Sequence, residues 1–426
     1  MPPIEDHPQR YRLANELHAR PFPAMSVPCT VTYIAIETAR NAADRNGDAA
    51  RNHLTALLDR HGALHPQPGA IHYTGRMGRH RLKWERHTEF VTFMAFVNGV
   101  RERPFDPADF EVFPNEWLAQ TPGRRITSAT IRLVPRPERN VIEKAFADWF
   151  VPESLAVSSV LDGAAEIAGD FRIDPAGHLR FAVFADPETG RERIGRLVQR
   201  LCEIETYTSM SMQGLAKARE VAEVIDGLDS RLMQLMSDVN EGARPVEETL
   251  PQLLGIATEL ETIAAQSAFR FGATGAYEAI VKNRIAVLRE NRCAGRQTFG
   301  EFMTRRYEPA MRTVTSVDMR LATMADRAMR AGQLLRTRVD VERSAQNQQL
   351  LESMNRRADL QLRLQRTVEG LSVVAISYYA VSLTSYLLAP IAEPAGMSKG
   401  ILSAVITLPI VAVVWFFVRR IRRKFA

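Results

Sequence analysis

The chain is poor in cysteine and lacks the short signatures that mark the common catalytic sites. It has 426 residues and three cysteines, which lie far apart and match no metal-ligand spacing: Cys29, Cys202 and Cys293. It contains no G-x-x-x-x-G-K-S/T phosphate loop, no G-x-S-x-G nucleophile elbow and no H-E-x-x-H zinc motif. We therefore expect reduced thiols, no catalytic residue, no cofactor and no enzymatic activity.

Formal charge is missing from two apolar runs near the end of the sequence, at 371–388 and 401–418. Each run has about 18 residues, close to the ~20 that a helix needs to cross a ~30 Å hydrocarbon layer. A strand is excluded, because an open strand in lipid would leave its backbone polar groups unpaired. We expect a transmembrane helical hairpin over 371–420, with spans at 371–391 and 401–418. A buried hairpin in the core of a soluble protein is the alternative.

Histidine is missing from everything after His178, and the sequence changes character near Pro187. Before that point, turn signals alternate with short β-like runs, which favours a mixed domain of the α+β or α/β class. Beyond it the pattern is helical. We expect five regions: a cytoplasmic mixed domain at 1–187, a helical domain at 188–308, a long stalk helix at 309–370, the transmembrane hairpin at 371–420 and a basic cytoplasmic tail at 419–426.

The spacing of apolar and turn residues also predicts individual elements. Strands are expected at 29–37, 72–76, 79–86, 89–97, 125–134, 158–160, 164–173 and 179–185. Helices are expected at 11–19, 44–61, 141–150, about 189–240 and about 246–291, with another starting near 296 or after 309. Strand order does not follow from these patterns.

Proline is absent between Pro309 and Pro390, so a helix of ~80 residues, spanning ~120 Å, could run into the first membrane segment. Apolar residues keep a 3–4 spacing along it, first at Leu321, Met324, Ala328, Ala331 and Leu335, then at Leu351, Met354, Ala358 and Leu362. Such a seam favours a coiled coil. We expect a homo-oligomer through this helix and the first membrane helix. Packing against the two preceding helices of the same chain is the alternative, and both can hold together.

Positive charge is concentrated at the flanks of the apolar runs. The formal net charge is +6, and five of the positive charges follow the second run: Arg419, Arg420, Arg422, Arg423 and Lys424. The rest of the chain is near neutral, which does not favour nucleic-acid binding. Since Lys and Arg stay on the cytoplasmic side, we expect these residues to be topology anchors. The expected protein is multi-pass, in contact with the lipid bilayer, with cytoplasmic N- and C-termini.

The opening 20 residues lack the apolar core of a signal peptide. The soluble part is therefore expected to stay in the cytoplasm.

Hydroxyl groups are frequent in the first apolar run. Tyr378, Ser382 and Ser385 fall at i, i+4 and i+7, hence on one face of a helix, and are candidate pore-facing or interface-facing residues. Hydroxyls that bond to their own backbone are the alternative. Neither run contains Asp, Glu, Lys, Arg or His, which disfavours coupled transport. A channel lined by hydroxyls and backbone carbonyls is still compatible with these runs.

One expected strand of the N-terminal domain carries polar chemistry. Alternation in 84–89 places Glu85, His87 and Glu89 on the face opposite Trp84. His72 and His80 lie on neighbouring expected strands and could join His87 around a metal ion, although the spacing is not diagnostic. Any metal ligand is therefore unknown, and a solvated sheet face is the alternative.

Three stretches resemble an uncharacterised family of bacterial membrane-anchored proteins. They are H-P-Q-R-Y-R-L-A-N-E-L-H-A-R-P-F at 7–22, W-E-R-H-T-E-F at 84–90 and T-V-E-G-L-S-V-V-A-I-S-Y-Y at 367–379. The resemblance covers nearly the whole chain. It implies a bacterial inner-membrane protein and assigns no activity.

The order of the expected parts is similar to that of the CorA-type divalent-cation channels. Those are homo-pentamers whose first membrane helix lines the pore and ends in Gly-Met-Asn preceded by Tyr. In this chain the candidate outer loop has Gly396, Met397 and Ser398, with Ala395 before them and Lys399 after them. The resemblance implies a CorA-like layout and a divalent cation as a candidate substrate. A membrane-tethered scaffold or sensor that acts through its cytoplasmic domain is the alternative function.

Overall fold

The computed structural model describes residues 4–11, 13–14, 22–38, 48–392 and 398–425. The helix expected at 11–19 lies largely outside these residues, as do Gly396 and Met397 of the candidate outer loop. The chain forms two compact units. The first combines 1–244 with 251–331, and the second combines 245–250 with 332–426.

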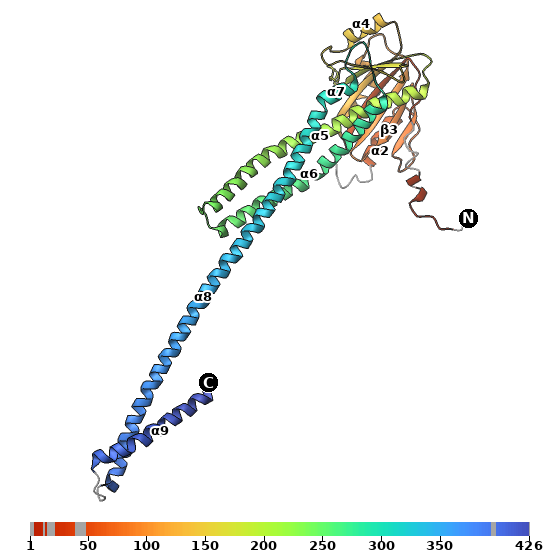
Figure 1. Cartoon of the computed structure of the whole chain (residues 1–426). Coiled ribbons are helices and arrows are strands. Elements are labelled where there is room, and N and C mark those ends of the chain that lie inside the picture. Colours follow the sequence, from red (N-terminus) through yellow and green to blue (C-terminus); the bar gives the residue numbers. More distant parts are fainter. Residues whose placement is uncertain (1–3, 12, 15–21, 39–47, 393–397, 426) are drawn as a thin grey trace. The chain divides into compact units, whose positions relative to one another are not determined.

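A mixed β-sheet forms the centre of the first unit (Figure 1). Its order in the described residues is β2-β3-β4-β1-β5-β8-β7-β6-β9. The strands are β1 Cys29–Thr38, β2 His72–Met77, β3 His80–Arg86, β4 Phe90–Asn98, β5 Gly123–Pro135, β6 Ala156–Val160, β7 Ala165–Gly169, β8 Leu179–Ala185 and β9 Asn291–Arg292. The pairing of β5 with β8 is parallel and the other pairings are antiparallel. The unit is therefore α+β, the first of the two expected classes.

One face of the sheet is covered by short helices. These are α2 Asp48–Asp59, the 3-10 helix η2 Pro107–Val112 and α3 Asn115–Ala119. Their shared core includes the fully buried residues Leu54, Trp84, Phe93 and Trp117. Complete burial of each such side chain contributes about 1.5–3 kcal/mol. The Trp117 indole N–H donates a 2.8 Å hydrogen bond to the His53 carbonyl, so the polar atom of this buried ring has a partner.

Helix α4 Arg139–Trp149 builds a second, smaller core with the other half of the sheet. Phe146 and Phe184 meet there edge to face, with ring centroids 5.8 Å apart. This helix connects β5 to β6. Together with β6 and β7 it forms the crossover between β5 and β8, which pair in parallel.

The first half of the long helix α5 Arg191–Asn240 packs on the sheet, opposite the α2 core. Its first turns bury Ile194, Leu197, Val198 and Leu201. The Tyr33 hydroxyl of β1 lies 2.6 Å from the Thr206 hydroxyl of α5. The side chains that β3 and β4 turn toward α5 therefore enter a covered space rather than solvent.

Helix α6 Val246–Leu288 returns antiparallel to α5, and α7 Phe299–Arg306 and α8 Glu308–Ala392 follow (Figure 1). Thr298 caps α7 through a capping box with Glu301. Within the first unit, α8 buries Leu321, Met324 and Ala328, and Arg320 forms an ion pair of 2.6 Å with Asp226 of α5. This half of the apolar seam is thus buried within the chain.

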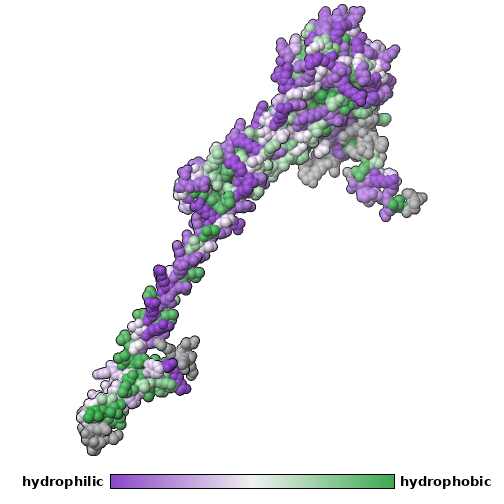
Figure 2. Space-filling view, in the orientation of Figure 1, coloured by the Kyte–Doolittle hydropathy of each residue, from purple (hydrophilic) through white to green (hydrophobic). Residues whose placement is uncertain are grey.

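The second unit contains the remainder of α8 and helix α9 Lys399–Phe425. Each contributes a helical segment long and apolar enough to cross a membrane. The most apolar window is 6% buried in the first and 0% buried in the second, so both segments are exposed on the surface of this chain. Figure 2 shows their hydrophobic side chains on the surface.

Candidate functional site: a charged cavity beneath helix α5

A cavity of about 220 Å³ lies between the inner face of β3 and β4 and helices α5 and α6. It belongs entirely to the first unit. Its lining combines aromatic rings with charged and amide side chains, among them Lys83, Glu85, Gln199, Glu203 and Arg284. A cleft or cavity with a few convergent polar groups is the usual form of a small-molecule site.

Local sequence periodicity positions the side chains from β3. Successive residues of a strand point to opposite faces, so Lys83 and Glu85 turn toward α5 while Leu82 and Trp84 enter the α2 core. On α5, Gln199 and Glu203 are four residues apart and share one side of the helix. Two regular elements thus present two polar side chains each to the same space.

The polar side chains form a continuous chain of contacts. The Lys83 ammonium lies 3.2 Å from Glu85 Oε1 and donates a 2.6 Å hydrogen bond to Gln199 Oε1. The Gln199 amide donates to Glu203 Oε1 over 2.8 Å, and Arg284 Nε of α6 donates to Glu203 Oε2. Two carboxylates and two cations alternate along this path, so the cavity wall has no net charge.

Glu85 remains incompletely satisfied. Lys83 is 3% exposed and Glu85 is 9% exposed. Glu85 Oε1 is buried, and among the described residues it accepts no hydrogen bond, because its ion pair with Lys83 lacks hydrogen-bond geometry. Buried polar atoms nearly always have a partner. The Glu85 carboxylate therefore depends on the Lys83 ammonium, 3.2 Å away, for its charge compensation.

The stability of the fold does not explain these charges. Removing an ion from water costs several kcal/mol, and a well-packed apolar replacement of a buried pair is often equally stable or more stable. Recognition of a polar molecule gives a reason to keep such groups in the wall of a cavity.

The thiol and phenol in the lining are held protonated. Burial raises the pKa of the Cys202 thiol well above its usual range, and burial also raises the pKa of Tyr33. A protonated thiol is a poor nucleophile. The geometry thus supplies hydrogen bonds and ion pairing and no activated sulfur.

Glu85, His87 and Glu89, which the sequence places on one strand face, have different surroundings in the structure. Glu85 and His87 line the cavity, and the His87 ring stacks on Phe90 with centroids 4.4 Å apart. Glu89 instead accepts hydrogen bonds of 2.8 Å from Arg270 and Tyr277 of α6. It therefore joins the sheet to α6.

Four cavity residues were not singled out from the sequence: Lys83, Gln199, Glu203 and Arg284. The first could have been found by extending the strand alternation two residues back from Glu85. The four-residue spacing of Gln199 and Glu203 is a weaker signal, because it is common on solvated helices. Arg284 gives no local signal, since it meets Glu203 across 81 sequence positions.

The three strand histidines do not converge. His72 pairs with Glu85 at one end of the β2–β3 hairpin, and His80 pairs with Met77 at the other end. Burial lowers the pKa of His80 to about 4, so it is neutral at physiological pH. In the part of the chain that the structure describes, no group of three or more His, Cys, Asp or Glu is arranged to hold a metal ion.

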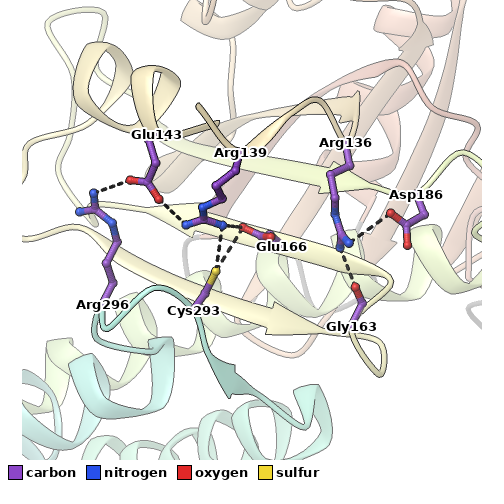
Figure 3. A network of polar contacts seen from close by, with 8 residues as sticks. All are labelled: Arg136, Arg139, Glu143, Gly163, Glu166, Asp186, Cys293 and Arg296. Atoms are coloured by element: carbon purple, nitrogen blue, oxygen red, sulfur yellow. Dashed lines mark hydrogen bonds and ion pairs between the residues drawn. The ribbon is translucent and has the colours of Figure 1, made fainter. Parts of the chain in front are cut away.

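A second polar network lies at the edge of the sheet near β9 (Figure 3). Arg139 of α4 contacts Glu143 and, over 2.8 Å, Glu166 of β7, and Arg296 reaches Glu143 over 2.9 Å. The Cys293 thiol lies 3.3 Å from Glu166, and burial raises its pKa. The network fastens the segment after α6 to the sheet, which is a structural role.

The residues singled out in the membrane runs occupy different surroundings. The Ser385 hydroxyl lies 3.2 Å from the Ser403 hydroxyl of α9, Ser382 is half-buried and Tyr378 is 69% exposed. Ser377 is buried, and its hydroxyl has no hydrogen-bond partner among the described residues. Their common role in an assembly stays a prediction.

Part of the candidate outer loop and of the basic tail is also described. Ser398 is exposed. Arg419 and Arg420 are exposed on α9, and the Arg419 guanidinium lies over the Trp415 ring, 4.9 Å from its centroid. Arg422, Arg423 and Lys424 continue the same helix, while their side chains lie outside the described atoms.

The fold and cavity define an α+β protein with long helices, two exposed apolar segments and a covered polar pocket. Residues 5–425 match DUF3422, described as a protein of unknown function, and the chain belongs to that family. No curated protein and no solved structure gives a significant match. The expected membership of an uncharacterised family is thereby confirmed.

Proposed function

We propose that this protein is a membrane-anchored sensor that binds a small polar solute in the charged cavity beneath α5. The observation that carries the anchor is the exposure of the two apolar segments, of which 6% and 0% are buried. The large apolar residues exposed there include Leu371, Leu387, Leu408 and Phe416, at 58–79% of their surface. Water-exposed apolar area costs about 25 cal/mol per Å², so a lipid environment suits this surface.

The positive flanks support one orientation. Arg419 and Arg420 are exposed at the end of α9, and such residues stay on the cytoplasmic side of a membrane. The proposal is a two-span protein of the bacterial inner membrane with both termini in the cytoplasm. Carbonate extraction of membranes tests the anchoring: release of the chain into the soluble fraction would contradict it.

The cavity defines the class of solute. Its volume of about 220 Å³ is below the 300–1,000 Å³ of sites for drug-sized ligands, so the occupant is small. The alternating charges on Lys83, Glu203 and Arg284 suit a solute that carries both signs. A free amino acid or a similar zwitterion meets these requirements.

The ligand claim is tested by thermal shift of the full chain in detergent against a panel of free amino acids and betaines. Stabilisation of the native protein by at least one compound, lost in Glu85→Gln, supports it. Glu188→Gln is the matched control, because Glu188 is exposed in a loop. A shift that survives in Glu85→Gln would place binding elsewhere.

We also propose that the protein is a homo-oligomer through α8. In the second unit, Leu351, Met354 and Leu362 are 61%, 57% and 53% exposed, and their spacing places them on one side of α8. Contiguous apolar residues at helical spacing on an exposed helix favour pairing with another helix. A second copy of α8 offers the same seam.

Cation passage through a CorA-like assembly is the second candidate function. The hydroxyls of Ser385 and Ser403 meet between the two apolar helices, and Ser377 buries another hydroxyl, so polar atoms lie inside the hairpin. Purified protein in liposomes, tested for divalent-cation flux, examines this candidate. Flux no greater than in empty vesicles would remove it and leave the sensor proposal in place.

A further inference from the structure

A second cavity lies on the other side of α5 and has a different chemical character. It has a volume of about 470 Å³ and is bounded by β5, β8, α5 and α7, all within the first unit. Apolar side chains form much of its wall, among them Phe171, Leu179, Met212 and Phe302. The volume lies within the range of sites that enclose an organic molecule.

A carboxyl group with spare hydrogen-bonding capacity lines this apolar space. Glu205 of α5 is 6% exposed, and its Oε1 accepts hydrogen bonds from Thr127 over 3.0 Å and from Ser209 over 2.9 Å. No residue that the structure describes donates to Oε2. The adjacent Thr208 hydroxyl is buried and likewise lacks a partner among the described residues. The apolar cavity therefore contains a carboxyl oxygen, Glu205 Oε2, that a ligand can satisfy.

Two arginines stand at the rim. Arg125 at the start of β5 and Arg306 at the end of α7 line the cavity and are exposed to solvent. Neither guanidinium has an ion-pair partner in the described ranges. Gly177, at φ +90°, leaves room for one of them, because a Cβ atom there would lie 3.1 Å from Arg125 Nη2.

We propose that this cavity binds an amphiphilic anion, with its apolar body among Phe171, Met212 and Phe302 and its head group at Arg125 and Arg306. Arginine is suited to carboxylate and phosphate oxygens because its donors match them in pairs. A hydroxyl or acid proton on the ligand would reach Glu205. The site is separate from the charged cavity and independent of the zwitterion proposed there.

The buried carboxyl group of Glu205 is compatible with the binding of an anionic ligand. Burial raises the pKa of its carboxyl to about 7, so a large share of it is uncharged at neutral pH. An uncharged carboxyl does not repel an anion and can donate a hydrogen bond. Tyr307, which also lines the cavity, has a pKa of about 12 and stays neutral there.

Equilibrium binding of four radiolabelled probes to the full chain in lipid nanodiscs tests the proposal, with empty nanodiscs as background. The probes are octanoate, octyl phosphate, octanol and octyltrimethylammonium. At least one of the two anions should bind saturably, while the alcohol and the cation should not. The anion that binds with the higher affinity identifies the head group as a carboxylate or a phosphate. Equal binding of all four probes, or saturable binding of neither anion, would overturn the proposal.

Three variants locate the site. Arg306→Gln should weaken anion binding about tenfold, the loss expected for one charge-assisted hydrogen bond. Arg305→Gln is the matched control, because Arg305 is a neighbouring exposed arginine whose guanidinium donates to Gln297 over 2.9 Å. Met212→Trp should abolish binding by filling the cavity, with circular dichroism to confirm the fold. Equal losses in the two arginine variants would show a non-specific charge effect and overturn the assignment.

Discussion

The Lys83 ammonium donates a 2.6 Å hydrogen bond to the Gln199 side chain, and this contact joins strand β3 to helix α5 across 116 sequence positions. Both residues are more than nine-tenths buried. A lysine in such a position needs a counter-charge, and Glu85 supplies it from two residues away on the same strand. The charged cavity is thus built into the junction between the sheet and the helical part.

Loss of the Lys83 charge should destabilise the protein. Lys83→Met leaves the Glu85 carboxylate buried without its cation, which costs about 3–5 kcal/mol. The full chain in detergent should therefore unfold at a lower temperature. Lys83→Met with Glu85→Leu should recover most of the loss, because neither charge is then buried. Lys144→Met, at an exposed position on α4, is the control. Equal melting temperatures for the two single lysine variants would contradict the burial of this pair.

Glu205 should make stability depend on pH. Its pKa rises from the ordinary 4.5 to about 7 on folding, so the folded protein keeps a proton that the unfolded chain releases. The stability from this group is fully present below about pH 4.5 and is lost as pH rises through about 7. Relative to Glu205→Gln, the wild type should lose on the order of 3 kcal/mol across that window.

Melting temperatures of the wild type and Glu205→Gln at several pH values check this prediction. The other charged groups that line the same cavity are Arg125 and Arg306. Glu188→Gln, an exposed carboxylate, should follow the wild type. Parallel curves for the wild type and Glu205→Gln would contradict the raised pKa.

The exposed half of the α8 seam should control assembly. Leu351→Gln with Leu362→Gln removes two apolar residues from one face while keeping good helix formers. If copies associate through this face, the particle mass in detergent should fall. Leu360→Gln with Leu364→Gln changes equally exposed leucines on the opposite face and should leave the mass unchanged. The same mass in both double variants would exclude the seam as the interface.

The basic end of α9 should determine orientation. Replacing Arg419, Arg420, Arg422, Arg423 and Lys424 with glutamine removes the positive flank of the second apolar helix. An alkaline phosphatase fused after Ala426, which is active only outside the cytoplasm, should be inactive on the wild type and gain activity on the variant. Arg336→Gln with Arg338→Gln, at exposed positions of α8, is the control. Activity on the wild-type fusion would reverse the proposed topology.

Elements with strong local patterns were predictable. The strand expected at 179–185 is found as β8 with the same bounds, and β1 extends one residue beyond the expected 29–37. The long helices also follow their apolar spacing, with α5 starting at Arg191 and α6 ending at Leu288. The short helix α3 and the two-residue strand β9 were missed, because segments of that length carry little periodicity.

The candidate site was predictable only in part. Strand alternation correctly separated Glu85 from Trp84, since it depends on backbone geometry alone. It could not show that Glu89 would accept a hydrogen bond from Arg270, or that Glu203 would accept one from Arg284. Each of these partners lies on a helix that is distant in the sequence. The Glu205 cavity gave no signal, since an isolated glutamate on a long helix resembles any solvated residue.

The sequence by itself determined the uncharged apolar runs, the long helices and the alternation within strands, because these depend on neighbours a few residues apart. Tertiary structure decided the order of the sheet, the parallel pairing of β5 with β8 and the two cavities flanking α5. It also decided that Leu321 is buried while Leu351, in the second group of apolar residues on α8, is exposed. Local periodicity defines an apolar face, and only packing between distant segments determines what covers it.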